Sequence, residues 1–477
     1  MPGVTGITTV GARERTVENQ HLSSMRISNK MKVRAAPFFV ASLAFLLAAG
    51  GIVASARSPV RDPEGFMAGE PLRPVEGADQ PMTLEHFEFV GHSELDGFAD
   101  YGDVWGHGNY AYVGSRCGED GRGGDGVQVV SLRDAEHPSV VSTLSNRPDT
   151  RVEDVVVIHV DAPAFSGELA VVGVQACNET EVAPGLRFFD VSDPRHPEML
   201  SHWNLHRGTA GCHEIDAVQR EDGLVLAGCA RSSIDHDVSF GKRSVNIIDA
   251  TDPEVPTSIA RWTLGANPIR GTGWLPKQFA HSVRFQNDGM SLYVSNWDAG
   301  TVNLDISNPT SPKIVRVIDI IPPDEDGDNH SMTLANHGRW LVINTEDFSP
   351  VASPGVAEFG GWGEVYVYDN RDETHPRLLG TFSTDNSRST RTDGIYSDHN
   401  TEVVHNDQFF SSWYADGVVW WTMNKRGVTH QLGHFVPPGP EGSPFIWGVY
   451  PIRRKSLILA SDTLTGLWIV RPEDLDF

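Results

Sequence analysis

Basic residues are scarce in this chain: 38 lysines and arginines stand against 63 aspartates and glutamates, for a formal net charge of −25. A nucleic-acid partner is excluded, because no basic stripe is available to displace counterions from a phosphate backbone. Three catalytic motifs are also missing from the sequence: the G-x-S-x-G elbow, the Walker loop and H-E-x-x-H. The G-x-G-x-x-G string at 121–126 is not a dinucleotide fingerprint, because it leads into the apolar run at 127–131 rather than into a helix. The usual chemistry of serine hydrolases, nucleotidases and nicotinamide enzymes therefore has no support, and no catalytic residue is assigned.

An apolar segment near the N-terminus is typical of export. Lys32 and Arg34 precede an uncharged run over residues 35–56, which ends in an A-x-A pattern. We predict a signal peptide, or a signal anchor if the segment is not cleaved, since about 20 apolar residues can span a bilayer. Either alternative places the rest of the chain outside the cytoplasm, as a secreted, periplasmic or envelope-associated protein that meets a membrane only through this segment. We divide the chain into four predicted segments. Residues 1–30 are disordered or precede the true start codon, and residues 31–56 form the signal peptide or anchor. Residues 57–81 are a linker, and residues 82–477 form one repeat domain.

A motif recurs through this repeat domain. Its clearest copies occupy residues 186–197, 245–256 and 301–312, and each combines an apolar run, an Asp and a turn bounded by Pro. Weaker copies lie at 127–131, 365–369, 418–422 and 467–471. Seven copies at spacings of about 50–64 residues match the period of propeller blades.

Each copy predicts a four-stranded antiparallel unit. The apolar run is a strand with a buried face, the Asp can accept backbone N–H bonds in the following turn, and the Pro stops strand pairing. Two more strands precede the motif, as at residues 281–285 and 291–295, and one follows it. We therefore predict an all-β fold, a seven-bladed β-propeller. The last copy lacks its outermost strand and residues 84–91 resemble one, so we expect an N-terminal strand to close the ring.

The repeated units resemble those of a known family. Phe-Phe-Asp-Val-Ser-Asp-Pro at 188–194 and Leu-Asp-Ile-Ser-Asn-Pro at 304–309 are similar to LVIVD repeats, which occur in exported bacterial and archaeal propellers. This resemblance covers roughly residues 84–477 and implies a fold rather than an activity. Residues 291–300, which run into 305–309, also resemble the selenium-binding protein/methanethiol oxidase propellers, a family associated with metal-dependent thiol oxidation. That likeness is confined to one blade.

Histidines recur at the start of the innermost strands. Aligned on their first apolar residue, these strands share a position that holds Gly102, Glu153, His213, His281, His330, His399 and Trp447. The first strand of each blade lines the central channel, so we expect four imidazoles near one mouth, two or three of them converging, with Glu153 next in the ring. Such ligands can hold Zn, Cu or Fe. The alternative is that these side chains only bond water and backbone in a polar channel.

The same face is expected to carry long loops. Four connections between strands are longer than tight hairpin turns, and long loops on one face usually indicate a binding surface; they are 115–126, 175–185, 230–244 and 344–363. Aromatic and acidic residues add a candidate ligand-binding rim: Trp297, Asp298, Trp413, Tyr414, Asp416 and Trp447. This mixture suits sugars, peptides or cationic ligands. Clustered oxygens at 324–329 also make a candidate Ca²⁺ site.

Four cysteines fall within the first three repeats. Cys212 starts an innermost strand and Cys229 ends the strand antiparallel to it, so we expect a disulfide between them. Cys117 and Cys177 end second strands of adjacent units and form the second expected pair, although four cysteines permit three pairings. The alternative is a thiolate metal site with His213, but the sequence contains no C-x-x-C.

Three functions remain open from the sequence. The first is a non-enzymatic, exported, monomeric propeller that binds a protein or small-molecule ligand through its loop-rich face. The second is a metal-dependent oxidoreductase or hydrolase that works at the channel mouth. The third is an envelope-anchored structural protein, which requires residues 35–56 to persist in the mature chain.

Overall fold

The computed structural model describes residues 81–475, apart from 97–99, 118–123, 146, 148, 178–183, 206–210, 232–244, 265–278, 298, 319–327, 348–361, 390, 392 and 440–442. The chain divides into two units, 1–56 and 57–477, and every described residue belongs to the second. The predicted segments 1–30 and 31–56, and the predicted linker except its last residue, lie outside the described residues. Within the described part of the chain, no helix has the length and hydropathy needed to cross a bilayer.

Short antiparallel strands follow one another through the described residues. The first three groups are β3 (Tyr101–His107), β4 (Tyr110–Ser115), β5 (Val127–Ser131) and β6 (Ser139–Leu144); β7 (Thr150–Asp161), β8 (Ser166–Ala176), β9 (Gly185–Asp190) and β10 (Glu198–Asn204); and β11 (Cys212–Gln219), β12 (Val225–Arg231), β13 (Val245–Asp249) and β14 (Thr257–Trp262). The next two are β15 (Ser282–Gln286), β16 (Ser291–Ser295), β17 (Thr301–Asp305) and β18 (Lys313–Ile318); and β19 (Asn329–Ala335), β20 (Trp340–Thr345), β21 (Val365–Asp369) and β22 (Arg377–Phe382). The last two are β23 (Thr401–Val404), β24 (Gln408–Ser412), β25 (Val418–Met423) and β26 (Thr429–Val436); and β27 (Ile446–Ile452), β28 (Leu457–Asp462) and β29 (Gly466–Pro472), with the 3-10 turn η1 (Arg453–Lys455) between β27 and β28.

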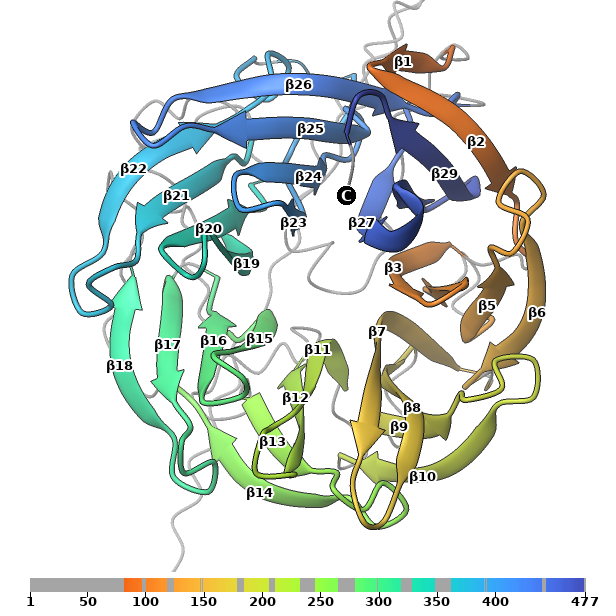
Figure 1. Ribbon diagram of the computed structural model, residues 1–477, viewed down its shortest axis with the longest axis vertical. Helices are drawn as coiled ribbons and strands as arrows, with labels where there is room; N and C mark the ends of the chain where they lie inside the picture. Colours follow the sequence, from red (N-terminus) through yellow and green to blue (C-terminus); the bar gives the residue numbers. More distant parts are fainter. Residues whose placement is uncertain are drawn as a thin grey trace, which may run out of the picture. The chain divides into compact units, whose positions relative to one another are not determined.

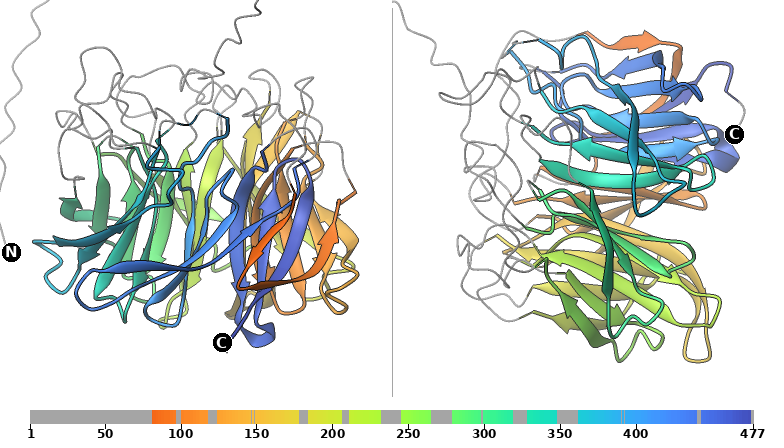
Figure 2. Two further views of the ribbon diagram at one scale, coloured as in Figure 1. Left: turned by 90° about the horizontal axis from the view of Figure 1, so that it is seen from above. Right: turned by 90° about the vertical axis from the view of Figure 1, so that its left-hand side faces the viewer.

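The strands pair in chain order within each group, and the groups stand around one axis (Figure 1). The first strand of each group, such as β11 or β19, lies nearest this axis, and the fourth, such as β14 or β22, lies on the outside (Figure 1). Figure 2 shows the same sheets from two sides, standing next to one another around the ring. A single pair, Ser115 with Val152, joins the first two groups into one continuous sheet. The predicted all-β propeller is confirmed. In the strand pairing, the described strands β2–β29 fall into seven groups of four when β2 is counted with β27–β29, and β1 adds a fifth strand to the group of β23–β26.

The N-terminal strands close the ring differently from the prediction. We expected one strand over residues 84–91, but the chain forms β1 (Thr83–Glu85) and β2 (Phe87–Ser93) with His86 between them. His86 has a φ of 56°, a left-handed conformation that ends one strand and lets the next start in a new direction. β1 pairs with β26, whereas β2 pairs with β29 and completes the last blade as expected.

The repeated Asp residues cap turns as the sequence predicted. Asp190, Asp249 and Asp305 each end a third strand and accept the backbone N–H two residues later, at 2.8, 3.0 and 2.9 Å. The apolar residues of these strands are buried and pack between neighbouring blades. One such cluster joins Ile247 of β13 to Leu304 of β17. The motif therefore encodes both a turn and a contact between blades.

Candidate metal centre

Four histidines lie at the same end of four consecutive innermost strands. His213 is the second residue of β11, and His330 is the second residue of β19. His281 directly precedes β15, and His399 lies two residues before β23. Since these strands surround the axis, the four imidazoles approach one another across blade boundaries.

The imidazoles form a continuous row. The ring centroids of His213 and His281 are 4.5 Å apart, and their Nε2 atoms face each other at 3.0 Å. The centroid spacings from His281 to His330 and from His330 to His399 are 4.2 and 4.1 Å. The structure thus brings all four histidines together, where the sequence predicted that two or three would converge.

Two carboxylates lie against this row. Glu214 Oε1 is 3.4 Å from Nδ1 of His281 and 3.3 Å from Nε2 of His330. Glu346 follows β20, and its carboxylate oxygens lie 3.5 Å from Nε2 of His330 and 3.8 Å from Nε2 of His399. Six donor side chains, the histidine cluster of the following text, therefore share one buried site; they are His213, Glu214, His281, His330, Glu346 and His399.

Burial sets the protonation state of this cluster. It lowers the pKa of His281 to about 3 and holds the pKa values of the other three histidines well below their usual range. It also raises the pKa values of Glu214 and Glu346 well above theirs. The imidazoles are therefore neutral, which is the form that ligates metals. A bound cation would oppose the shift of the carboxylates, because it stabilises their charged form.

Several buried atoms of the cluster lack a hydrogen bond. Both ring nitrogens of His330, Nδ1 of His281 and Nδ1 of His399 make no hydrogen bond of good distance and angle with any residue that the structure describes. The backbone of His330, His399 and Trp447 nevertheless lies near enough to the rings of His281, His330 and His399, respectively, to raise their pKa values slightly against the effect of burial. Oε2 of Glu346 also makes no hydrogen bond with a described residue. Leaving a buried polar group unpaired costs about 1–3 kcal/mol. A neutral imidazole has one N–H and one nitrogen with a lone pair, so each of these histidines can offer one lone pair to a metal cation.

Two sets of three ligand atoms are spaced closely enough for one metal ion. They are His213, Glu214 and His281, and His281, His330 and Glu346; in each set the atoms lie within 4.8 Å of one another. Ligand atoms around a tetrahedral metal lie about 3.4 Å apart. The Nε2 atoms of His213 and His281 lie 3.0 Å apart and share a hydrogen bond, which a metal ion bound by both nitrogens would replace. Nδ1 of His213 lies 3.3 Å from Oε1 of Gln175, and an N–H donated there leaves Nε2 unprotonated for the metal.

Glu153, the predicted carboxylate ligand, has a different partner. It is buried in β7, and its Oε2 lies 3.6 Å from Nε of Arg116. Among the described residues, Glu153 belongs to neither set of closely spaced ligand atoms. Its position in the ring, one blade before His213, lets it face Arg116 at the end of β4 instead. Glu214 and Glu346 take the place that the sequence assigned to Glu153.

The predicted ligand-binding rim needs correction, because most of its residues are buried. Trp297, Trp413, Tyr414, Asp416 and Trp447 are at most 4% exposed, and Asp298 lies outside the described residues. Trp297 packs on His281 with ring centroids 5.1 Å apart, and Trp447 packs on His399 at 4.6 Å. Tyr414 donates its hydroxyl to Glu346. Trp297, Tyr414 and Trp447 thus line the cluster, whereas Trp413 packs against Phe382 and donates its indole N–H to the carbonyl oxygen of Tyr396.

Alignment of the innermost strands did not single out Glu346 or Arg116. Both directly follow second strands, which run antiparallel to the innermost ones and end at the same mouth. In β19 and β20, for example, Asn329 pairs with Thr345, so the residue after Thr345 must lie near His330. An alignment of the ends of the second strands, made in the same way as that of the first strands, would have identified both residues.

The cysteine predictions are confirmed, and two other predictions fall on residues without a description. Disulfides join Cys117 to Cys177 and Cys212 to Cys229. The candidate Ca²⁺ site has residues 324–327 outside the described residues and stays a prediction. The same holds for the loop-rich face, because 118–123, 178–183, 232–244 and 348–361 are not described.

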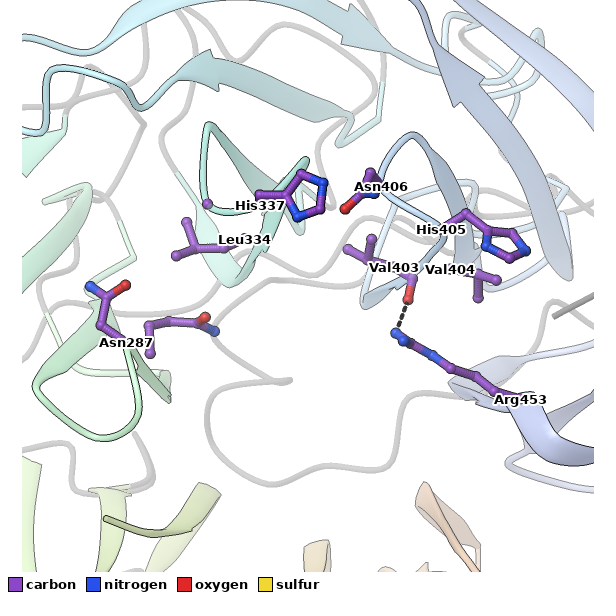
Figure 3. A pocket seen from close by; sticks show the side chains of 10 residues that line it. Asn287, Leu334, His337, Val403, Val404, His405, Asn406 and Arg453 are labelled. Atoms are coloured by element: carbon purple, nitrogen blue, oxygen red, sulfur yellow. Dashed lines mark hydrogen bonds between the residues drawn. The ribbon is translucent and has the colours of Figure 1, made fainter. Parts of the chain in front are cut away.

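A separate pocket of about 530 Å³ lies at the other end of the innermost strands (Figure 3). Gln286, His337 and His405 line it, together with Arg453, whose guanidinium donates to the carbonyl oxygen of Val403 at 2.6 Å. Gln286 ends β15, whereas His281 precedes it. At about 3.3 Å per residue this strand separates the pocket from the histidine cluster by roughly 16 Å. The pocket and the cluster are therefore different features of the ring.

Comparisons with known proteins agree with this architecture. A model of the LVIVD repeat matches residues 100–119 and 289–319. Among solved structures, the WD40 β-propeller domain of Doa1 is similar over 82% of this chain and 98% of that chain, with a TM-score of 0.50 and 11% sequence identity. Identity at this level shows the fold alone. No curated protein matches the chain.

Proposed function

We propose that this chain, an LVIVD-repeat β-propeller, binds a transition-metal ion at the histidine cluster and acts as a metal-dependent oxidoreductase or hydrolase. The observation that carries the proposal is the row of neutral, buried imidazoles, whose nitrogens at His281, His330 and His399 lack hydrogen-bond partners among the described residues. A metal ion is the ligand that suits this set, because it accepts imidazole lone pairs and compensates nearby carboxylates.

The donor set favours Zn, Cu or Fe. Imidazole suits these borderline metals, whereas Mg²⁺ and Ca²⁺ prefer sites made of oxygen atoms. Thiolate ligands do not contribute, since all four cysteines are joined in disulfides. Metal identity also separates the two reaction classes, because Cu and Fe support electron transfer and Zn supports hydrolysis.

The burial pattern indicates how substrate reaches the cluster. His213 is half-buried and the side chain of Glu214 is 14% exposed, whereas the other three imidazoles are at most 2% exposed. Substrate would therefore approach beside His213. Oε1 of Glu214 lies between His281 and His330, where a bound metal ion would favour the charged form of this carboxylate and so oppose the rise in its pKa that burial causes. A bound metal ion would supply a Lewis acid or a redox centre in this position.

Elemental analysis of the full chain, purified with its disulfides intact, tests this proposal. We expect about one equivalent of Zn, Cu or Fe, and loss of most of it in the triple variant His213→Ala, His281→Ala, His330→Ala. His213→Gln, at a half-buried position, is a second variant that is less disruptive to packing. The control is His375→Ala, whose side chain is 84% exposed. Metal below about a tenth of an equivalent in the unmodified protein contradicts the proposal.

Export belongs to the same proposal. The two disulfides support it, because such bonds persist in oxidising compartments. Mass spectrometry of the mature N-terminus should show cleavage near residue 56, and an intact segment 35–56 would instead support an anchored protein. Binding of a protein or small molecule through the loop-rich face stays a prediction.

A further inference from the structure

Two buried arginines lie beside the histidine cluster in a chain that is otherwise strongly acidic. Arg116 directly follows β4 and is 4% exposed, and Arg151 in β7 is 5% exposed. Guanidinium groups are rarely buried unless they are paired. Other arginines of the chain are buried too, such as Arg187 and Arg220, but Arg116 and Arg151 lie close enough together for the charge of one to lower the pKa of the other.

One carboxylate, that of Glu153, acts electrostatically on both guanidinium groups, although neither of its oxygens makes a hydrogen bond with a described residue. Nε of Arg116 lies 3.6 Å from Oε2 of Glu153, which is too long for a hydrogen bond. Burial lowers the pKa of Arg151 to about 10, with Glu153 opposing and Arg116 adding to the shift, so this group is still protonated at neutral pH. Arg116 and Arg151 thus carry one more charge than Glu153, the carboxylate that acts on both of them, while Glu346 lies farther along the cluster within the electrostatic reach of Arg116.

The donors of these side chains are not satisfied. Nε and Nη1 of Arg116, Nε of Arg151 and Nε2 of the buried Gln175 make no hydrogen bond with any residue that the structure describes. Arg151 and Gln175 are paired across β7 and β8, so their side chains start from neighbouring positions. Unpaired N–H groups on and beside two positively charged side chains are the complement of an anion with several oxygen acceptors.

This donor group borders the histidine cluster on two sides. Gln175 Oε1 lies 3.3 Å from Nδ1 of His213, the imidazole beside which substrate would approach. The guanidinium carbon of Arg116 lies 4.2 Å from the ring centroid of Trp447, which itself packs on His399. The disulfide between Cys117, next to Arg116, and Cys177, two residues after Gln175, holds the ends of β4 and β8 together. The donors are thus fixed in place before any ligand binds.

We propose that Arg116, Arg151 and Gln175 form an oxyanion-binding subsite that takes the carboxylate, sulfonate or phosphate group of the substrate beside the metal centre. The inference rests on the proposed function for the role of this anion, but not for its binding, because the donors belong to the protein alone. It narrows the substrate class to molecules with an anionic group within reach of the reacting atom, and it explains why two buried cations lie so close together.

Calorimetric titration of the full chain with sulfate, at constant ionic strength, tests the subsite. Arg151→Gln removes one guanidinium while Arg116 stays beside Glu153, and we expect sulfate affinity to fall roughly tenfold or more. Arg116→Lys keeps the positive charge but loses the planar pair of N–H donors of the guanidinium group, so it should weaken sulfate binding with little effect on folding. Arg471→Gln, on the exposed face of β29, is the matched control and should leave sulfate binding unchanged. Circular dichroism checks that each variant is folded.

Metal analysis of the same samples separates this inference from the proposed function. Sulfate binding that depends on Arg151 in a protein without metal supports the subsite and contradicts the metal centre. Equal sulfate affinity in Arg151→Gln and the unmodified protein, with metal present, overturns the subsite and leaves the metal centre standing. A parallel titration with methylphosphonate identifies the source of the anion: binding supports an organic substrate, and failure to bind while sulfate binds supports a free inorganic oxyanion.

Discussion

Carboxylates on the innermost strands connect each blade to the next. Asp154 in β7 accepts the backbone N–H of Ile215 in β11 at 2.9 Å, and Asp216 in β11 accepts that of Phe285 in β15 at 2.6 Å. Burial raises the pKa of Asp216 to about 6 and, with the nearby charge of Glu214, that of Asp154 to about 8. The folded ring therefore binds protons that an unfolded chain would release.

Asp154→Asn tests this consequence. Between pH values of about 4 and about 8 the folded protein keeps the Asp154 proton while the unfolded chain has lost it, so the free energy of unfolding falls as pH rises. The Asn variant retains an oxygen acceptor for Ile215 and should show a weaker decline over this range. Urea unfolding at several pH values measures it. Equal pH slopes in the variant and the unmodified protein would refute the raised pKa.

The histidines could be predicted from sequence because each blade contributes one residue at the same register. Glu346 and Arg116 could not be, since their place depends on how second strands from different blades converge around the axis. Arg151 was missed for another reason. Its environment is set by Gln175 across the strand pair and by Arg116 from the preceding blade, and neither contact is visible in a one-dimensional pattern.

Among the elements, the repeated third strands were predictable and the N-terminal pair was not. Apolar alternation followed by Asp specifies both a strand and its turn, as in β13 with Asp249 or β17 with Asp305. Residues 84–91 contain no Pro and no Gly before Gly91, so a break at His86 was not visible in the pattern. The left-handed backbone of His86 divides the segment, and the division lets it contact two blades.

Phe87→Ala tests how much the closing strand β2 contributes. Phe87 is 3% exposed and packs against Phe410 and Trp420 of the neighbouring blade, with ring centroids 6.1 Å away in each case. Its truncation should cost about 3–5 kcal/mol of unfolding free energy. Phe89→Ala in the same strand is the control, because Phe89 is 44% exposed and should lose less. Similar losses at both positions would mean that β2 does not hold blades together through Phe87.

The whole ring is held by contacts between blades as well as within them, and the two disulfides differ in this respect. Cys117–Cys177 connects the first two blades across 60 residues, whereas Cys212–Cys229 lies within one blade across 17. Loop-closure entropy predicts losses of about 4 and about 3 kcal/mol when each pair is replaced by Ser.

Thermal unfolding of the two double-Ser variants compares them. The variant without Cys117–Cys177 should have the lower midpoint, and it should also bind sulfate more weakly, because this bond fixes the strand ends that present Arg116 and Gln175. A lower midpoint for the Cys212/Cys229 variant, with sulfate affinity unchanged in both, would show that the bond between blades neither stabilises the ring more nor positions the subsite.

The pairing of β2 with β29 joins two strands that are synthesised far apart in time, so the order in which the strands are made differs from the order in which they pair. The ribosome makes β2 before the seven groups of strands, whereas its partner β29 follows all the other described strands, so β2 stays unpaired until β29 has been made. A product that stops short of β29 leaves both edges open to proteases and to other chains. Only products that include β29 can close the ring, which therefore discriminates against chains truncated before that strand.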